Sequence, residues 1–297
     1  MFEEVKKNKI KSWVLIIVFI LIIINLGAII GFIYGNLYFG IISALLISLI
    51  YVVFSYFSGD KAILKTSGAR EVTKKEYPHL FHLIDGLSIS AGLPKPKAYV
   101  IEDSALNAFA TGRNPEHASI TVTTGLLKKM NRQELEGVIA HEMSHIKNYD
   151  VRFMMLVVML VGLVTLLSDF MFRSFLWGNK GKSSNKKSGN GFIILVIIAV
   201  ILAILSPIIG QIIHFSISRK REFLADANAA ILTRYPPGLA GALKKIAKDP
   251  DPLVDKANKA TAHLFISTPF RKEHGFVSKL FLTHPKLEER IKRLEEM

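Results

Sequence analysis

Residues 141–145 read His141-Glu142-Met143-Ser144-His145, and the rest of the chain is best interpreted from this stretch. Residues four apart on an α-helix lie one turn apart on the same face, so His141 and His145 can bind one metal ion. Glu142 borders that face, because it lies about 100° around the helix from His141. Two imidazoles and a third ligand leave one tetrahedral position for a water, whose pKa then falls toward ~7. The stretch therefore predicts a catalytic zinc site.

An alternative interpretation places the same residues on the solvated face of a surface helix. The preceding segment argues against it. Asn131 is a suitable N-cap for a helix that begins at residue 132. The apolar residues Val138, Ile139 and Ala140 lead directly into the motif. We therefore expect a largely buried helix, in which an unpaired imidazole would be costly.

Four apolar runs are long enough to cross the ~30 Å hydrocarbon layer of a bilayer. They cover residues 13–34, 38–57, 153–172 and 192–213. The first run is too long for the core of a signal peptide and lacks a small-residue cleavage site, so it is interpreted as a retained anchor. The sequence thus predicts a polytopic membrane protein with two hydrophobic hairpins and about four transmembrane helices.

The net charge of +14 is explained first by membrane topology. Four lysines lie within residues 6–11, before the first run, whereas the turn Gly35-Asn36 after it carries no charge. The positive-inside rule then places the N-terminus in the cytoplasm, and two spans return residues 59–150 to that side. No basic stripe interleaved with aromatic residues stands out, so nucleic acid is not an expected partner.

The loop at residues 178–191 does not fit the simplest topology. It is rich in Gly, Ser and Asn and holds four lysines, which would lie outside if both later runs span fully. Alternatively, this hairpin is shallow or partly buried in protein. Asp169, Pro207, Gln211 and His214 make it less lipid-like than the first hairpin. The sequence leaves both possibilities open.

Residues 221–230 predict a second helix that offers a third ligand. Glu222 and Asp226 lie one turn apart, so Glu222 could complete a His-His-Glu site while Asp226 orients a ligating imidazole. The same helix could instead be an exposed one with solvated charges. The chain has no cysteine, which excludes disulfides and thiolate ligands and suits a reducing compartment.

Two longer strings, HEMSHIKNYD at residues 141–150 and SRKREFLADANAA at residues 218–230, together resemble HtpX-type membrane metalloproteases, relatives of the CaaX prenyl endopeptidases. The resemblance covers nearly the whole chain. Its other landmarks lie at residues 68–72, 91–94, 107–112, 121–127 and 283–285. Small departures occur at Ala105-Leu106 and at Thr268-Pro269, where proline and Asn-Pro are the usual residues.

The resemblance implies an α-rich α+β fold with a zincin-like (gluzincin) catalytic domain in the cytoplasm. In such proteins His141, His145 and Glu222 would ligate one Zn²⁺ per chain, and Glu142 would be the general base. Imidazole and carboxylate also accept other divalent ions.

The chain then divides into four parts. Residues 1–58 form an N-terminal transmembrane hairpin, and residues 59–152 form a cytoplasmic catalytic part that contains the HExxH helix. Residues 153–213 form the second hairpin with its basic loop. Residues 214–297 form a further catalytic part with the third ligand. Because the second hairpin crosses twice or not at all, both catalytic parts lie on one side.

Residues 97–103 and 119–124 predict strands, and residues 107–112 lie between them. In the implied zincin-like arrangement, an edge strand here would bind an extended substrate, and Asn107, Ala108 and Phe109 would contact it. The alternative makes Asn107 a turn residue and Phe109 part of the core.

A tetrahedral oxyanion needs a further donor, and Arg221 and His284 are the candidates. Alternatively, His284 caps the closing helix, and Arg221 pairs with Asp226 or with lipid phosphate.

Both ligand-bearing helices lie close to apolar runs, so the metal is expected within about 15 Å of the membrane surface. A site in this position would meet membrane proteins, or their exposed loops and ends, more readily than free cytosolic proteins. The resemblance alone then implies a stress-response, quality-control endopeptidase of the bacterial or archaeal plasma (inner) membrane. It would cleave membrane-protein or unfolded polypeptide substrates at cytoplasmic segments. A processing protease for one defined peptide and a non-catalytic scaffold with a structural zinc remain alternatives. A transporter is disfavoured, because no internal repeat is visible. Nothing in the sequence indicates the oligomeric state.

Overall fold

The computed structural model describes residues 2–163, 219–249, 266 and 285–297. The second predicted hairpin beyond residue 163, its basic loop and His284 lie outside the described residues. The described part is rich in helices and contains one small sheet, as the sequence predicted.

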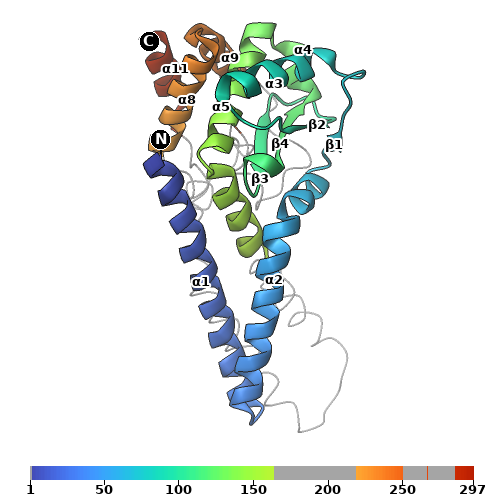
Figure 1. Ribbon diagram of the computed structural model, residues 1–297, viewed down its shortest axis with the longest axis vertical. Coiled ribbons are helices and arrows are strands. Elements are labelled where there is room, and N and C mark those ends of the chain that lie inside the picture. Colours follow the sequence, from blue (N-terminus) through green and yellow to red (C-terminus); the bar gives the residue numbers. More distant parts are fainter. Residues whose placement is uncertain (1, 164–218, 250–265, 267–284) are drawn as a thin grey trace, which may run out of the picture.

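Two long helices, α1 (Phe2–Ile33) and α2 (Leu37–Thr66), form the N-terminal hairpin (Figure 1). Both are long and apolar enough to cross a membrane. The turn between them uses Gly35 at φ 79° and Asn36, whose side chain caps α2 by accepting from the Phe39 N–H at 3.1 Å. The helices approach closely at Gly27 and Gly40, where a β-carbon would collide with the facing backbone. This contact fixes the far end of the hairpin.

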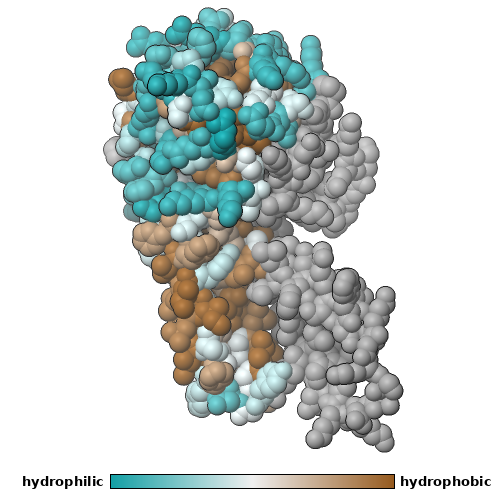
Figure 2. All heavy atoms as spheres, turned by 90° about the vertical axis from the view of Figure 1, so that its right-hand side faces the viewer, coloured by the Kyte–Doolittle hydropathy of each residue, from teal (hydrophilic) through white to brown (hydrophobic). Residues whose placement is uncertain are grey.

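The hairpin exposes a broad apolar surface. Figure 2 shows hydrophobic side chains over this part of the molecule and mostly hydrophilic ones over the catalytic part. Ile17, Leu21 and Ile50 are each more than half exposed. Such a continuous apolar surface is characteristic of a membrane segment. Helix α2 also continues to Thr66, beyond the apolar run at residues 38–57, because its last two turns pack onto the catalytic part through the buried Ile63 and Leu64.

The sheet contains β1 (Arg70–Glu71), β2 (Lys97–Ile101), β3 (Ala108–Gly112) and β4 (Ala118–Thr123) in the order β1-β2-β4-β3. Strands β2 and β4 are parallel, and β3 pairs with β4 antiparallel, with Phe109 opposite Thr121. The predicted strands are confirmed, and β3 lies at the edge of the sheet.

Helix α5 (Arg132–Lys147) carries the HExxH motif through the centre of the catalytic part. Its start is fixed by a capping box between Asn131 and Glu134, as the sequence indicated for Asn131. The helices α3 (Pro78–Ala91), α8 (Arg219–Thr233) and α9 (Pro236–Lys248) pack around it, and α11 (Leu287–Glu295) packs on α8 and α9. The short helices η1 (Pro115–His117) and α4 (Thr124–Lys129) flank β4.

After α5, Tyr149 adopts a left-handed conformation at φ 61° and the chain continues as a helix over residues 150–163. Met155, Leu156 and Val157 in this segment are fully buried against a cluster that includes Phe19 and Ile63 of the hairpin. The described start of the third apolar run is therefore enclosed by protein.

Gly137 allows α5 to approach α9, and we expect Gly137→Ala to destabilise the fold. Alanine would gain about 1 kcal/mol of helix propensity. However, its β-carbon would lie 2.6 Å from the backbone nitrogen of Leu239, and such overpacking costs about 1–3 kcal/mol. The free energy of unfolding of the unaltered and Gly137→Ala proteins measures the difference.

Gly86→Ala in α3 is the matched control, because nothing lies within 4 Å of its added β-carbon. It should stabilise by about 0.5–1 kcal/mol. Equal effects of the two substitutions would contradict the packing argument.

Candidate metal centre

The three predicted ligands lie together although they come from distant parts of the chain. His141 and His145 come from α5 and Glu222 from α8, and all three are buried. One ligand atom from each lies within 4.8 Å of the others. The two Nε2 atoms are 3.2 Å apart, and Glu222 oxygens lie 3.7 Å from His141 Nε2 and 3.5 Å from His145 Nε2. The group could hold a metal ion.

These separations fit a divalent ion of the size of zinc. Ligand bonds of 2.0–2.1 Å in a tetrahedral arrangement place neighbouring ligand atoms ~3.3 Å apart. The donor set of two imidazoles and one carboxylate is also the chemistry that such ions accept. The described residues therefore fit the metal that the sequence predicted.

Each histidine is held by a carboxylate on its other ring nitrogen. His141 Nδ1 lies 3.0 Å from Asp226 Oδ1, and His145 Nδ1 lies 3.0 Å from Asp150 Oδ2. Carboxylates in this position fix the orientation of a ligating imidazole and raise its basicity. The geometry for Asp226 agrees with the sequence-based expectation, whereas Asp150 was not predicted as a site residue.

Arg290 of α11 is a further residue that the sequence analysis missed. It is completely buried and binds Asp226 through Nε at 2.8 Å and through Nη2 at 2.6 Å. Burial opposes its charge, but Asp226 and Glu222 raise the pKa of Arg290 above its already high usual value. A pattern in the sequence could have revealed it, because Leu287, Ile291 and Leu294 place Arg290 on the apolar face of its helix.

Burial and neighbouring charges shift the pKa values of the two histidines in opposite directions. Burial lowers the pKa of His141, and Arg290 and His145 lower it further, which favours the neutral form that binds metals. Burial opposes the charge of His145 as well, but Asp150 and Glu222 raise its pKa to about 9. The carboxylates around His145 thus favour a positive charge at this point of the site.

Glu142 follows His141 on α5 and is 3% exposed. Burial raises the pKa of its carboxyl to about 7, while the charge of His145 and a hydrogen bond from the backbone N–H of Ala110 oppose this rise. Glu142, the two histidines, Glu222 and Ala110 line the same small pocket of about 10 Å³. The carboxyl is therefore tied to the edge strand on one side and faces the ligands on the other.

Successive residues of β3 direct their backbone N–H and C=O groups alternately toward β4 and away from it. Asn107 bonds to β4, since the Thr123 N–H donates to its carbonyl at 3.0 Å. Ala108 and Ala110 point their backbone groups away from β4, because Ala108 accepts from the Ile266 N–H at 3.0 Å and Ala110 donates to Glu142. The outer edge of β3 thus borders this small pocket.

The side chains of the predicted substrate residues lie inside the protein. Phe109 is 1% exposed and packs in the apolar cluster with Met155 and Phe153, which is the alternative that the sequence left open. The Asn107 side chain is buried and accepts from the Ala108 N–H at 3.1 Å. At this strand, a substrate would therefore meet the outer main-chain edge of β3 and not these two side chains.

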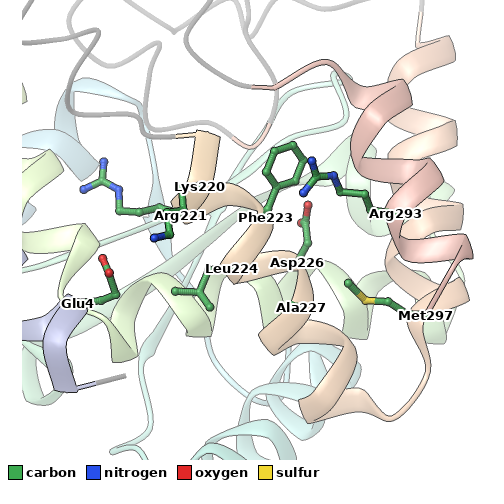
Figure 3. A pocket seen from close by; sticks show the side chains of 9 residues that line it. All are labelled: Glu4, Lys220, Arg221, Phe223, Leu224, Asp226, Ala227, Arg293 and Met297. Atoms are coloured by element: carbon green, nitrogen blue, oxygen red, sulfur yellow. The ribbon is translucent and has the colours of Figure 1, made fainter.

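Arg221 is buried, and its guanidinium lies 3.4 Å from Asp150 and 3.2 Å from the side-chain oxygen of Asn8. It lines a separate cavity beside α8 (Figure 3). His284, the other candidate donor for an oxyanion, lies outside the described residues.

A buried two-histidine, one-carboxylate group with an adjacent glutamate and an edge strand defines a metallopeptidase. Residues 74–297 match the family described as Peptidase family M48, and the chain belongs to this family. It is a metalloprotease.

Curated relatives extend the match over the whole chain. The chain is 46% identical to a protein called "Protease HtpX homolog" from Dictyoglomus turgidum, over 100% of this chain and 94% of that relative. A protein of the same name from Streptococcus gordonii is 38% identical over 100% of both chains. The crystal structure of S. mikatae Ste24p is similar in fold, with a TM-score of 0.50 and 21% identity over 99% of this chain and 67% of that chain. The predicted resemblance is confirmed.

Proposed function

We propose that this chain is a multi-pass zinc endopeptidase of the plasma membrane that degrades misfolded or damaged membrane proteins at cytoplasmic segments. His141, His145 and Glu222 bind one Zn²⁺, and Glu142 is the general base. The observation that carries the proposal is the buried His-His-Glu group whose ligand atoms lie within 4.8 Å of one another. Three protein ligands leave the fourth position open, which is typical of catalytic rather than structural zinc.

The chemistry is hydrolysis of a peptide bond. When bound, a divalent ion in this site supplies Lewis acidity to the scissile carbonyl and lowers the pKa of a nearby water. Glu142 accepts the proton of the attacking water and transfers it to the leaving amine. The Ala110 N–H holds the carboxylate in position for both transfers.

The substrate is bound as an extended chain along β3. The outer edge of β3 provides main-chain pairing next to Glu142. The substrate would bond to the Ala108 carbonyl in place of the Ile266 N–H, while the Ala110 N–H stays with Glu142. Asn107 and Phe109 support this edge from within the sheet. His284 remains the proposed second donor to the oxyanion, whereas Arg221 acts through its contacts with Asp150.

The membrane location determines which substrates reach the site. The motif helix α5 is followed directly by the helix at residues 150–163, which packs against the membrane hairpin. The exposed lysines at the start of α1 and the uncharged turn before α2 support a cytoplasmic catalytic part. Exposed loops and ends of damaged membrane proteins would meet such a site more readily than free cytosolic proteins would.

Reconstitution into vesicles tests the proposed substrate class. The full-length protein loaded with Zn²⁺ would be combined with one polytopic test protein, either folded or carrying a destabilising core substitution. We expect faster cleavage of the destabilised form, at several sites in its cytoplasmic segments. Cleavage at one defined sequence irrespective of folding would instead identify a processing protease.

A further inference from the structure

Asn8 lies near the start of α1, and its side chain is buried although its neighbours are exposed lysines. It is 1% exposed, whereas Lys7 and Lys9 on either side are exposed. It shares a face of α1 with Ser12, Leu15 and other buried residues that pack against the catalytic part. The first turns of the membrane hairpin thus insert one polar side chain into the protein.

The side-chain amide of Asn8 bonds to residues 140 or more positions away. Its Nδ2 donates to the carbonyl of Asn148 at 2.9 Å and to Asp150 Oδ1 at 2.7 Å. Its Oδ1 accepts from Arg221 Nη1 at 3.2 Å. These partners determine the orientation of the amide, because a flipped amide would bring its oxygen against two acceptors and its nitrogen against a cation.

Asp150 connects this amide to the metal centre. One oxygen, Oδ1, accepts from Asn8 and lies 3.4 Å from Arg221, while the other, Oδ2, lies 3.0 Å from His145 Nδ1. The carboxylate is 2% exposed, so protein contacts rather than bulk water hold it. A carboxylate held at both oxygens fixes the ring on which it acts more tightly than one held at a single oxygen.

We propose that Asn8 is a positioning residue for the metal centre: through Asp150 it holds the His145 ring, so that the first membrane helix forms part of the metal site. The inference rests on the metal-binding role of His145 in the proposed function. It assigns a chemical task to a residue at the start of the membrane hairpin.

The packing beside Asn8 makes these hydrogen bonds important. Among the described residues, a cavity of about 360 Å³ separates the start of α1 from α8 and α11. Figure 3 shows Glu4 of α1 across this cavity from the side chains of α8, with Arg293 of α11 beside the Phe223 ring. Apolar packing of α1 begins farther along, at Leu15. The polar contacts of Asn8 therefore attach this end of α1 to the metal site.

The test compares Asn8→Ala with Ser12→Ala in the purified full-length protein. Ser12 is the matched control because it is equally buried and on the same helix face, yet its hydroxyl bonds to the Asn8 carbonyl within α1. Zn²⁺ affinity would be measured by competition with a chelator, and ligand geometry by the absorption spectrum of the Co²⁺-loaded protein. Because loss of a group that orients a ligand weakens affinity about 10–100-fold, we expect a loss of about 10-fold for Asn8→Ala. Its Co²⁺ spectrum should change, whereas Ser12→Ala should match the unaltered protein in both measurements.

A second comparison asks whether Asn8 acts through Asp150. In an Asp150→Asn background, Asn8→Ala should have little further effect on Zn²⁺ affinity. Additive losses would overturn the inference, as would an Asn8→Ala protein identical to Ser12→Ala in affinity and spectrum. If Asn8→Ala does not fold, Asn8→Ser provides the same comparison with a smaller polar side chain. If the unaltered chain does not bind Zn²⁺, the proposed function fails together with the inference. If it binds Zn²⁺ but Asn8→Ala behaves like Ser12→Ala, only the inference fails.

Discussion

Replacement of Glu142 by glutamine is expected to lower kcat for peptide hydrolysis by about 10²–10⁴-fold without loss of the metal. Glutamine keeps the size of the side chain, but it cannot accept a proton from water. Glu142 is buried beside the ligands and is tied to the Ala110 N–H, so no other described carboxylate is placed to replace it while Glu222 and Asp226 are engaged. Hydrolysis of an unfolded polypeptide and metal content per chain would be measured on the same preparations.

Glu134→Gln is the matched control for this prediction. Glu134 is a second buried glutamate on α5, and it belongs to the capping box at the start of the helix. Glutamine can take the same capping role, so activity should stay near that of the unaltered protein. A Glu142→Gln enzyme that retains activity within a few-fold would contradict the assignment of the general base. Joint loss of metal and activity would show a structural effect instead.

Replacement of Arg290 by leucine is expected to destabilise the protein by about 3–5 kcal/mol, since it leaves the Asp226 carboxylate buried without its cation. The pair lies entirely inside the protein and has two hydrogen bonds of 2.8 and 2.6 Å. The measurement is the free energy of unfolding of the chelator-treated protein, which separates this effect from metal binding. Adding Asp226→Asn to Arg290→Leu should recover part of the loss.

Arg293→Leu on the same helix provides the control. Its side chain is 51% exposed and pairs with Glu289 one turn away. It also stacks on Phe223. Exposed ion pairs and cation–π contacts of this kind contribute up to about 1 kcal/mol each. A similar loss for both arginines would show that α11 contributes through general packing and not through the buried pair.

The parts of the site that the sequence predicted are those set by local spacing. His141, His145 and Glu142 follow from the period of one helix, and Asp226 follows Glu222 by one turn of another. Only a few residue types bind zinc. Glu222 could therefore be combined with the two distant histidines from chemistry and resemblance. The N-terminal hairpin followed from the length of its apolar runs in the same way.

The residues that the sequence did not predict depend on contacts between distant segments. Arg290 reaches Asp226 from 64 residues away, and Asn8 reaches Asp150 from 142 residues away. A charged or amide side chain among lysines and glutamates is usually solvated, so its burial becomes visible only when the helices are packed. Phe109 illustrates the reverse case, because only the packed sheet shows that its ring faces the core.

The close glycine contact between α1 and α2 lies far along α1 from Asn8. About 20 residues at 1.5 Å each separate Gly27 from Asn8, which is a distance of about 30 Å. A change of tilt of about 5° around the glycine contact would move Asn8 by about 2.6 Å, nearly the length of its hydrogen bond to Asp150. Helices adjust their tilt to the thickness of the bilayer around them. A thickness change that tilts α1 by this amount would therefore shift Asn8 relative to Asp150, which supports the proposed metal ligand His145.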